Sequence, residues 1–375
     1  MDISFKFDPE VLIGAETLSM AGTIAKRHGS RIMVAADHRL DAQIVSRLKD
    51  ILVDSGLEAI VFDGIDESSS VEIADNIVEL SQAAHCDAII AFGGEKAQII
   101  SRMAAIMAPM RITAFELIEG RIFPSKILPL LAIPTEGVTS FSFTDYFIVT
   151  DPRSRLIASV QSPHNLYSAV IIDCNLINIL SSNTAAAFIL EGFFSAVEAF
   201  CSARSNFISD TLLDKALSLY AKLIRGGTAN FNAEQFAQAG FLTAVGACAS
   251  SPGTGAALSA AVNARTPVAK HLCAAALFPC VAQRLVSARP EKMSRLANLL
   301  GAPKPPSVAE GAASSVTVLR QIMASLNVSD NLKEFNIPLD RVTAAVEAAR
   351  GLDMTANSPW TVSEEEVFKI MKEIL

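Results

Sequence analysis

The chain lacks the clusters of basic residues and the paired cysteines that mark several common classes of protein. It has 31 lysines and arginines against 39 acidic residues, so its net charge is -8 and its pI is about 5.3. A nucleic-acid surface needs clustered Lys and Arg to bind phosphates, and the sequence has no such cluster. Its six cysteines are scattered without a CxxC pair, which predicts small buried thiols and argues against disulfides or a zinc site.

Neither a secretory leader nor a membrane span is predicted. The first residues, MDISFKFDPE, are partly acidic and have no long apolar core, so we expect a cytoplasmic protein. Residues 236–264 are uncharged over a length that could cross a membrane, but they are rich in Gln, Ser, Asn, Gly and Pro. We expect buried helices separated by a loop there, and neither a membrane nor nucleic acid as a partner.

Aliphatic residues make up most of the apolar content. Hydrophobic residues are 51% of the chain, whereas aromatic residues are only 6%. Ala, Ile, Leu and Val supply most of the remainder, which is typical of a helix-rich or α/β interior. A chain of 375 residues is too long for one ordinary core, so we expect two domains.

The first 150 residues alternate short apolar runs with amphipathic segments. Amphipathic spacing predicts helices at 41–56, 70–85 and 97–108. Short apolar runs predict strands at 31–37, 57–64, 86–94 and 127–135. Alternation of this kind predicts βαβ units and a parallel sheet with helices on both faces.

The pattern changes after residue 140. Residues 141–160 resemble a β-hairpin turned by Asp-Pro-Arg-Ser, and 168–175 is a last strand. From residue 183 nearly everything predicts helix, and Ser363 and Glu366 fit a capping box at the start of the last one. We therefore expect an α/β domain over residues 1–182 and an all-helical domain over 183–375.

Six short strings, spread over the whole chain, follow one family pattern in their order and spacing. They are VFDGIDESSS, CDAIIAFGGEK, LLAIPTEGVTS, AVIIDCNL, EGFFSAVEAFCS and ANSPWTVSEEEVFKIM. Each string alone is a weak signal. Together they resemble the iron-containing alcohol dehydrogenase superfamily, which also includes glycerol dehydrogenases and dehydroquinate-synthase-like enzymes.

The resemblance implies a dehydroquinate synthase-like fold of two domains. A Rossmann-like N-terminal domain would hold NAD or NADP, and a helical C-terminal domain would hold a divalent metal. The active site would lie in the cleft between them. A small alcohol, aldehyde or related metabolite is the implied partner, and a homodimer or larger homo-oligomer is the implied assembly.

The resemblance places the cofactor at the ends of the first strands. Asp37 stands where the family has an acid that accepts hydrogen bonds from the adenosine ribose, although an ordinary strand-end or cap role suits it equally. Gly93 and Gly94 match the first two residues of the family's Gly-Gly-Gly-Ser turn, whose amides approach the pyrophosphate. Here the turn continues as Glu95, which should repel a phosphate, and Lys96, which should attract one.

Other cofactor positions also differ from the family pattern. The Asp and Lys expected later in the same helix are Ile99 and Arg102. In the second loop, Thr135 and Thr139 keep the family's threonines, but Glu136 adds another acid. The implied cofactor is NAD or NADP, bound between loops that have gained two carboxylates.

The family's metal ligands are an Asp and a His four residues apart on one helix and two later His residues. Alignment of the strings places four residues at these positions: Glu191, Ser195, Ala256 and Lys270. Only Glu191 keeps a ligand, and a working site needs about three. His271 would supply an imidazole if the register were one residue off, with Glu198 as the one further acid nearby. We therefore predict that this chain does not bind the metal.

Lys270 suggests what replaces the metal. A buried carboxylate without its metal is costly unless another cation pairs with it. If Glu191 and Lys270 converge as the family's ligands do, their ion pair puts a protein charge where the metal's charge was. The alternative is that Lys270 is a solvated cation at a helix end.

Two functions remain open at this point. In the first, the chain is an NAD(P)-dependent oxidoreductase for a small alcohol or aldehyde, and Lys270, with Glu191, is catalytic because its ammonium donates to the carbonyl oxygen. In the second, the chain is a catalytically silent paralogue that binds a metabolite or a partner protein. A fold alone does not choose between them, because function depends on the site.

Overall fold

The computed structural model describes residues 3, 5–66, 70–120, 126–161, 166–177, 182–227 and 230–375. Its first half is built on a six-stranded parallel sheet with the order β1-β8-β5-β4-β2-β3. In that order the strands span Glu10–Gly14, Tyr167–Asp173, Leu130–Pro134, Ala88–Gly93, Arg31–Asp37 and Glu58–Ile65. The predicted parallel sheet is confirmed. The structure also contains the edge strand β1, which the sequence patterns did not predict.

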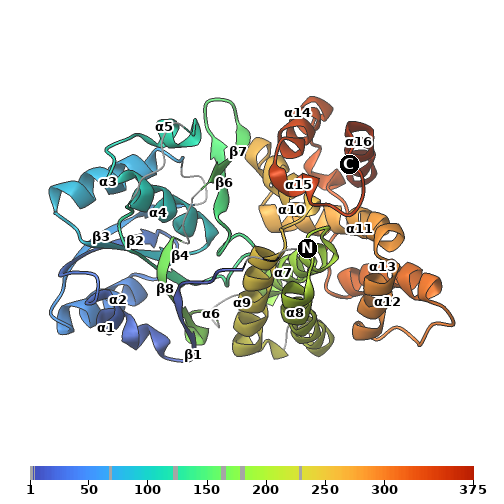
Figure 1. Cartoon of the computed structure of the whole chain (residues 1–375), viewed down its shortest axis with the longest axis horizontal. Helices are drawn as coiled ribbons and strands as arrows, with labels where there is room; N and C mark the ends of the chain where they lie inside the picture. Colours follow the sequence, from blue (N-terminus) through green and yellow to red (C-terminus); the bar gives the residue numbers. More distant parts are fainter. Residues whose placement is uncertain are drawn as a thin grey trace.

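Helices cover both faces of this sheet (Figure 1). Val34 and Phe92 pack with α1 and α2 on one face, whereas their neighbours Met33 and Ala91 pack with α3 and α4 on the other. Successive side chains of a strand point to opposite faces, so uniformly apolar strands suit a sheet buried on both sides. The helical segments of this half are η1 (Thr17–Met20), α1 (Ala21–Ala25), α2 (Ala42–Asp54), α3 (Ile73–Ala83), α4 (Glu95–Met107), α5 (Ala114–Ile118) and α6 (Cys174–Ile177).

The predicted hairpin is present and lies apart from the main sheet. It consists of β6 (Tyr146–Asp151) and β7 (Leu156–Gln161), which pair antiparallel. At its turn, the backbone and side chain of Arg153 both donate to the Asp151 carboxylate. Isoleucines of both strands pack in one core with α10, α11 and α14. The hairpin therefore links the sheet half of the molecule to the helical half (Figure 1).

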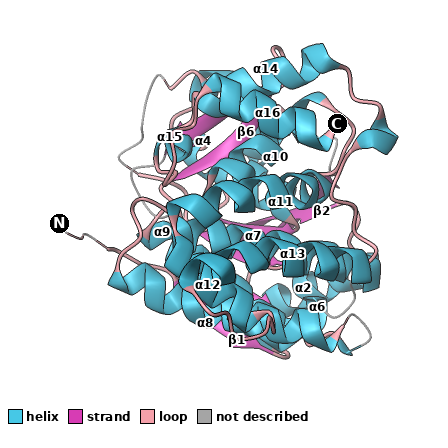
Figure 2. Cartoon of the chain, turned by 90° about the vertical axis from the view of Figure 1, so that its right-hand side faces the viewer, coloured by secondary structure: helices cyan, strands magenta, loops and turns pink. Residues whose placement is uncertain are grey.

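From residue 182 onward the described chain is helical, and Figure 2 shows this half facing the viewer. The predicted domain boundary lies at the start of α7. The helices are α7 (Ser182–Cys201), α8 (Phe207–Gly226), α9 (Ala233–Ala249), α10 (Thr254–Arg265), α11 (Lys270–Ala288), α12 (Pro290–Leu299), α13 (Val308–Ser325), η3 (Lys333–Phe335), α14 (Leu339–Arg350), α15 (Asp353–Ala356) and α16 (Glu364–Ile374).

Local sequence explains how the last helix begins. The hydroxyl of Ser363 accepts the amide of Glu366, as expected for an N-cap. The Glu366 carboxylate pairs with Arg284 and Lys369, and the structure gives it no return bond to the cap, so only half of the predicted capping box forms.

The apolar stretches of the helical half form buried helices. The uncharged stretch 236–264 forms α9 and α10 with a loop between them, as predicted. By length and composition, Thr184–Cys201 and Lys270–Ala288 are each apolar enough to cross a membrane, and 72% and 56% of these windows are buried inside the protein. Both helices pack in the hydrophobic core of the chain.

Candidate functional site

A cavity of about 670 Å³ lies where the N-terminus of α4 and the loop after β5 face helices α7, α10 and α11. All four aligned metal-ligand positions line it, which brings together residues from three helices. Lys96, Thr139 and His271 line it as well. The structure does not place Asp37, Gly93, Gly94 and Thr135 in the lining of the cavity. Gly94 and Thr135 are next to lining residues in sequence, and Asp37 and Gly93 are hydrogen-bonded to the lining residues Arg39 and Gln98.

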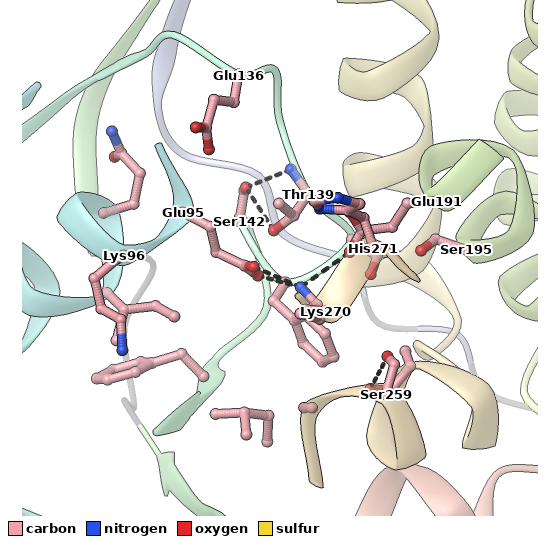
Figure 3. Close-up of a pocket in the computed structure, with 18 of the residues that line it drawn as sticks. Glu95, Lys96, Glu136, Thr139, Ser142, Glu191, Ser195, Ser259, Lys270 and His271 are labelled. Atoms are coloured by element: carbon pink, nitrogen blue, oxygen red, sulfur yellow. Dashed lines mark hydrogen bonds and ion pairs between the residues drawn. The ribbon is translucent and has the colours of Figure 1, made fainter. Parts of the chain in front are cut away.

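Lys270, the first residue of α11, connects the two walls of this cavity (Figure 3). Its ammonium donates to both carboxylate oxygens of Glu95 at 2.6 Å and lies 3.3 Å from Oε1 of Glu191. The expected contact between Lys270 and Glu191 is therefore present, and the alternative of a solvated helix-end cation is wrong. The closer partner, Glu95, stands at the third position of the glycine turn.

The carboxylates keep Lys270 charged. Its side chain is only 18% exposed, and burial alone would lower its pKa. The negative charges and hydrogen bonds of Glu95 and Glu191 outweigh burial, so they raise the pKa of Lys270 above its ordinary value. Lys270 is therefore charged at neutral pH.

The residues that converge here do not fit a catalytic metal ion. Ser195 and Ala256 replace two of the expected ligands, and the Lys270 ammonium lies against the one acid that remains, Glu191. Throughout the described parts of the chain, no group of three or more His, Cys, Asp or Glu side chains is placed to hold a metal. His271 lines the cavity and packs against the ring of Phe188 at 5.4 Å.

The backbone of the glycine turn fits the start of a phosphate-binding helix. Gly93 has φ of +145°, and a Cβ there would lie 2.4 Å from the Cβ of Asp37, so only glycine suits this position. Gly94 is the N-cap of α4, no side-chain hydrogen bond caps this end, and the first amides of a helix have no partners within it. This geometry is what a dinucleotide's pyrophosphate requires.

The carboxylate of Asp37 is hydrogen-bonded to Arg39. Its side chain is 3% exposed, and Arg39 donates to it from its backbone amide at 2.9 Å and from its guanidinium at 3.0 and 2.7 Å. Burial would raise the pKa of Asp37, but these hydrogen bonds and one from the Gly94 amide lower it. In this structure Asp37 binds Arg39 at the end of its strand and presents the guanidinium at the surface, and a role for Asp37 toward a ribose stays a prediction.

Glu136 lies over the start of α4. Its Oε1 accepts from Arg39 at 2.8 Å, and its Oε2 lies 2.1 Å from the position that a Cβ on Gly94 would take. In the same loop, the amide of Thr135 donates to the carbonyl of Gly93, and the amide of Thr139 donates to the hydroxyl of Ser142. The two retained threonines thus hold the loop in shape.

Arg102 is the buried support of that loop. Its guanidinium donates to the carbonyl oxygens of Phe141 and Thr144, both at 2.9 Å, and stacks over the ring of Phe147 at 4.5 Å. Arg102 is 3% exposed, and burial lowers its pKa. We noted this position in the sequence only as a departure from the family's lysine, because spacing does not show which carbonyls a side chain reaches.

Glu198 is a buried acid on the same face of α7 as Glu191 and Ser195. Its carboxylate accepts the amides of Gly255 at 2.6 Å and Ala256 at 3.1 Å, in the first turn of α10. Burial raises the pKa of Glu198 to about 7, and the two amide hydrogen bonds offset only part of that rise. The sequence offers Glu198 as one further acid for a metal, whereas in the structure its carboxylate binds the start of α10.

The raised pKa of Glu198 predicts a specific pH dependence of stability. Between pH 4.5 and about 7 the folded chain holds the Glu198 proton and the unfolded chain loses it, so stability falls as pH rises. The free energy of unfolding of the wild type should fall by about 3 kcal/mol across this window, at ~1.4 kcal/mol per pKa unit. The variant Glu198→Gln should lack this fall. Urea unfolding of both proteins at pH 5 and pH 8 measures the difference. Parallel pH profiles for wild type and variant would contradict it.

Comparison with known proteins identifies the family and the fold. The family model described as iron-containing alcohol dehydrogenase matches residues 8–174, and the model for the C-terminal part of this family matches residues 185–375. The chain is 22% identical to 1,3-propanediol dehydrogenase of Citrobacter freundii over 369 residues, which are 96% of this chain and 95% of that protein. It is 20% identical to lactaldehyde reductase of Escherichia coli strain K12, over 94% of each.

Solved structures show the same fold. A 1,3-propanediol oxidoreductase superposes with a TM-score of 0.92 at 20% identity over 100% of both chains. A sulfoacetaldehyde reductase from Bifidobacterium kashiwanohense in complex with NAD+ gives 0.85 at 19% identity, over 100% of this chain and 99% of that one. The predicted combination of a parallel-sheet N-terminal part and a helical C-terminal part is therefore confirmed. The chain belongs to the iron-containing alcohol dehydrogenase family.

Proposed function

We propose that this protein is an oxidoreductase that interconverts a small aldehyde and its alcohol with NAD or NADP, and that Lys270 acts in place of the metal ion. The observation that carries the proposal is the fixed ammonium of Lys270, which lines the cavity at an aligned ligand position. Membership of the family and the names of the relatives, which include two reductases of small aldehydes, support the reaction class.

The residues of the cavity define what the protein contributes. A bound dinucleotide would supply the hydride. Lys270 is proposed to turn one N–H from Glu95 to the carbonyl oxygen, where its positive charge stabilises the alkoxide that forms. A proton taken from solvent as the product leaves completes the alcohol. Glu95 and Glu191 keep Lys270 charged. Phe141, whose ring lies 5.7 Å from the ammonium, supplies an apolar wall that excludes water.

A chelator experiment tests the replacement of the metal. With a panel of small aldehydes and either reduced cofactor, we expect the rate to be unchanged by EDTA and by added Zn²⁺ or Fe²⁺. Replacing Lys270 by Met should lower kcat/KM by about 100-fold or more, as does loss of an oxyanion donor in other enzymes. Activity that a chelator abolishes would overturn the proposal.

A matched lysine variant controls for damage to the fold. Lys292 is also largely buried, at 20% exposed, and pairs with Asp210 on a different part of the helical half. Replacing Lys292 by Met should leave kcat/KM per folded molecule unchanged. An equal loss in both variants would contradict a specific role for Lys270, because Lys292 is not among the residues that line the cavity.

A second candidate is a silent binding protein, and the carboxylates at the cofactor end favour it. Glu136 lies against Gly94, and the contact between Glu95 and Lys270 crosses the cavity. A thermal-shift panel separates the two functions, because a ligand that binds only the folded state must raise its melting temperature. We expect NAD or NADP to raise it and Zn²⁺, Fe²⁺ and Ni²⁺ not to. No shift with any of them would favour the silent protein.

We propose from the sequence and the family that the protein is cytoplasmic and that it assembles as a homodimer or larger homo-oligomer.

A further inference from the structure

The start of α4 is the part of the cleft suited to an anion. Its 13 residues give the helix a dipole whose positive end lies at Gly94 and Glu95. Free amides at such an end attract a phosphate when nothing else is bound there. In this protein a carboxylate from the neighbouring loop already lies at that end.

Glu136 supplies that carboxylate. The position that a Cβ on Gly94 would take lies 2.1 Å, 2.5 Å and 2.9 Å from Oε2, Cδ and Oε1 of Glu136. The whole carboxylate therefore covers the open side of Gly94, the side from which a pyrophosphate would approach a glycine turn. Figure 3 shows the Glu136 side chain pointing down from its loop toward Glu95.

Arg39 holds Glu136 there. One guanidinium nitrogen of Arg39 bonds Oε1 of Glu136 at 2.8 Å and an oxygen of Asp37 at 2.7 Å. Because Asp37 is buried and fixed at the end of β2, the guanidinium has a fixed anchor and presents its remaining surface to Glu136. Glu136 is only 21% exposed, as expected for a side chain that fills a recess.

We propose that Glu136 determines how tightly this cleft binds a dinucleotide, because its carboxylate occupies the diphosphate position and must be displaced before the cofactor can bind. The proposal rests on the proposed function, since it takes the cofactor to bind at α4. A phosphate that enters meets a like charge at contact distance, and it must also release Glu136 from Arg39. Removing the carboxylate removes both costs at once.

Threonine is the informative replacement, since it removes the charge and shortens the side chain. We would titrate NADH into the full-length protein and follow its fluorescence. Glu136→Thr should bind NADH at least tenfold more tightly than wild type, and Glu136→Gln should also bind more tightly because it carries no charge. Equal or weaker binding by both variants would overturn the proposal, because Glu136 would then be neutral toward the cofactor or a ligand for it.

Glu58 provides the matched control. It is also paired with an arginine, Arg31, at 2.8 Å, but it lies at the start of β3, at the opposite end of the sheet from the cavity. Glu58→Thr makes the same change of charge and should leave NADH affinity unchanged. If Glu58→Thr gained as much NADH affinity as Glu136→Thr, the effect would come from net charge. The proposed role of Glu136 at the start of α4 would then be wrong.

The binding experiment is independent of turnover. If Glu136→Thr gains NADH affinity but reduces no aldehyde, Glu136 keeps its role and the proposed role of Lys270 fails. Suppose instead that the wild type binds NADH tightly and reduces an aldehyde, and that the Glu136 variants bind NADH more weakly. The proposal on Glu136 then fails and the oxidoreductase function stands.

Discussion

Replacing Lys270 by alanine should lower the free energy of unfolding by about 2–4 kcal/mol. The change leaves Glu95 and Glu191 facing each other in the cavity wall without their shared cation. Breaking a fully buried ion pair costs ~3–5 kcal/mol. We expect less here because the two carboxylates are 29% and 16% exposed and gain some hydration. The midpoint of urea unfolding measures the change.

Two further variants identify the cause of the loss. Lys369, which pairs with Glu365 on the surface of α16 and is 52% exposed, should be replaceable by alanine with little change in the midpoint. Replacing Glu95 by Gly together with Lys270→Ala removes one stranded charge and should recover part of the lost stability. An unchanged midpoint for Lys270→Ala would show that the contacts of Lys270 with the two carboxylates do not stabilise the fold.

Replacing Arg102 by alanine should cost about 3 kcal/mol or more. The carbonyls of Phe141 and Thr144 each lose a donor at 2.9 Å, and the ring of Phe147 loses the guanidinium that covers it. A buried polar group left without its partner costs ~1–3 kcal/mol, and the vacated volume adds to that. Because residues 139–143 line the cavity, the same variant should also weaken ligand binding there.

Methionine at the same position separates packing from hydrogen bonding. Arg102→Met fills most of the volume and relieves the burial of a charge, so it should cost less than alanine. Arg153, an arginine over the ring of Phe115 at 4.2 Å but 46% exposed, is the matched exposed case and should tolerate alanine. Equal midpoints for wild type and Arg102→Ala would contradict a supporting role for Arg102.

The main elements of the fold follow from local patterns that the sequence shows directly. β2 and β4 are continuous apolar runs, and the helices between them have apolar residues at helical spacing, so their type and order were predictable. β1 has only five residues, EVLIG, and pairs with β8 about 160 positions away. So short a segment carries little periodicity, and its pairing partner lies far along the chain.

The candidate site was partly predictable for a related reason. The family pattern placed Glu191 and Lys270 together, because the helices that carry them keep the family's order. The contact between Lys270 and Glu95 joins residues 175 positions apart, and that between Arg39 and Glu136 joins residues 97 apart. Neither pair belongs to the family pattern, so no spacing rule could bring them together. Only the bond between Arg39 and Asp37 had a local signal, since the two residues are two positions apart.

The bridge from Glu95 through Lys270 to Glu191 also restricts how this protein could change. A histidine introduced at position 270 would remove the cation and leave two carboxylates in the wall, so this single substitution would lower the stability of the fold. Glycine introduced first at position 95 would leave Lys270 with Glu191 alone, 3.3 Å away. A new side chain at position 270 therefore avoids a loss of stability only if position 95 changes as well, so the two positions are coupled in mutation although 175 positions separate them.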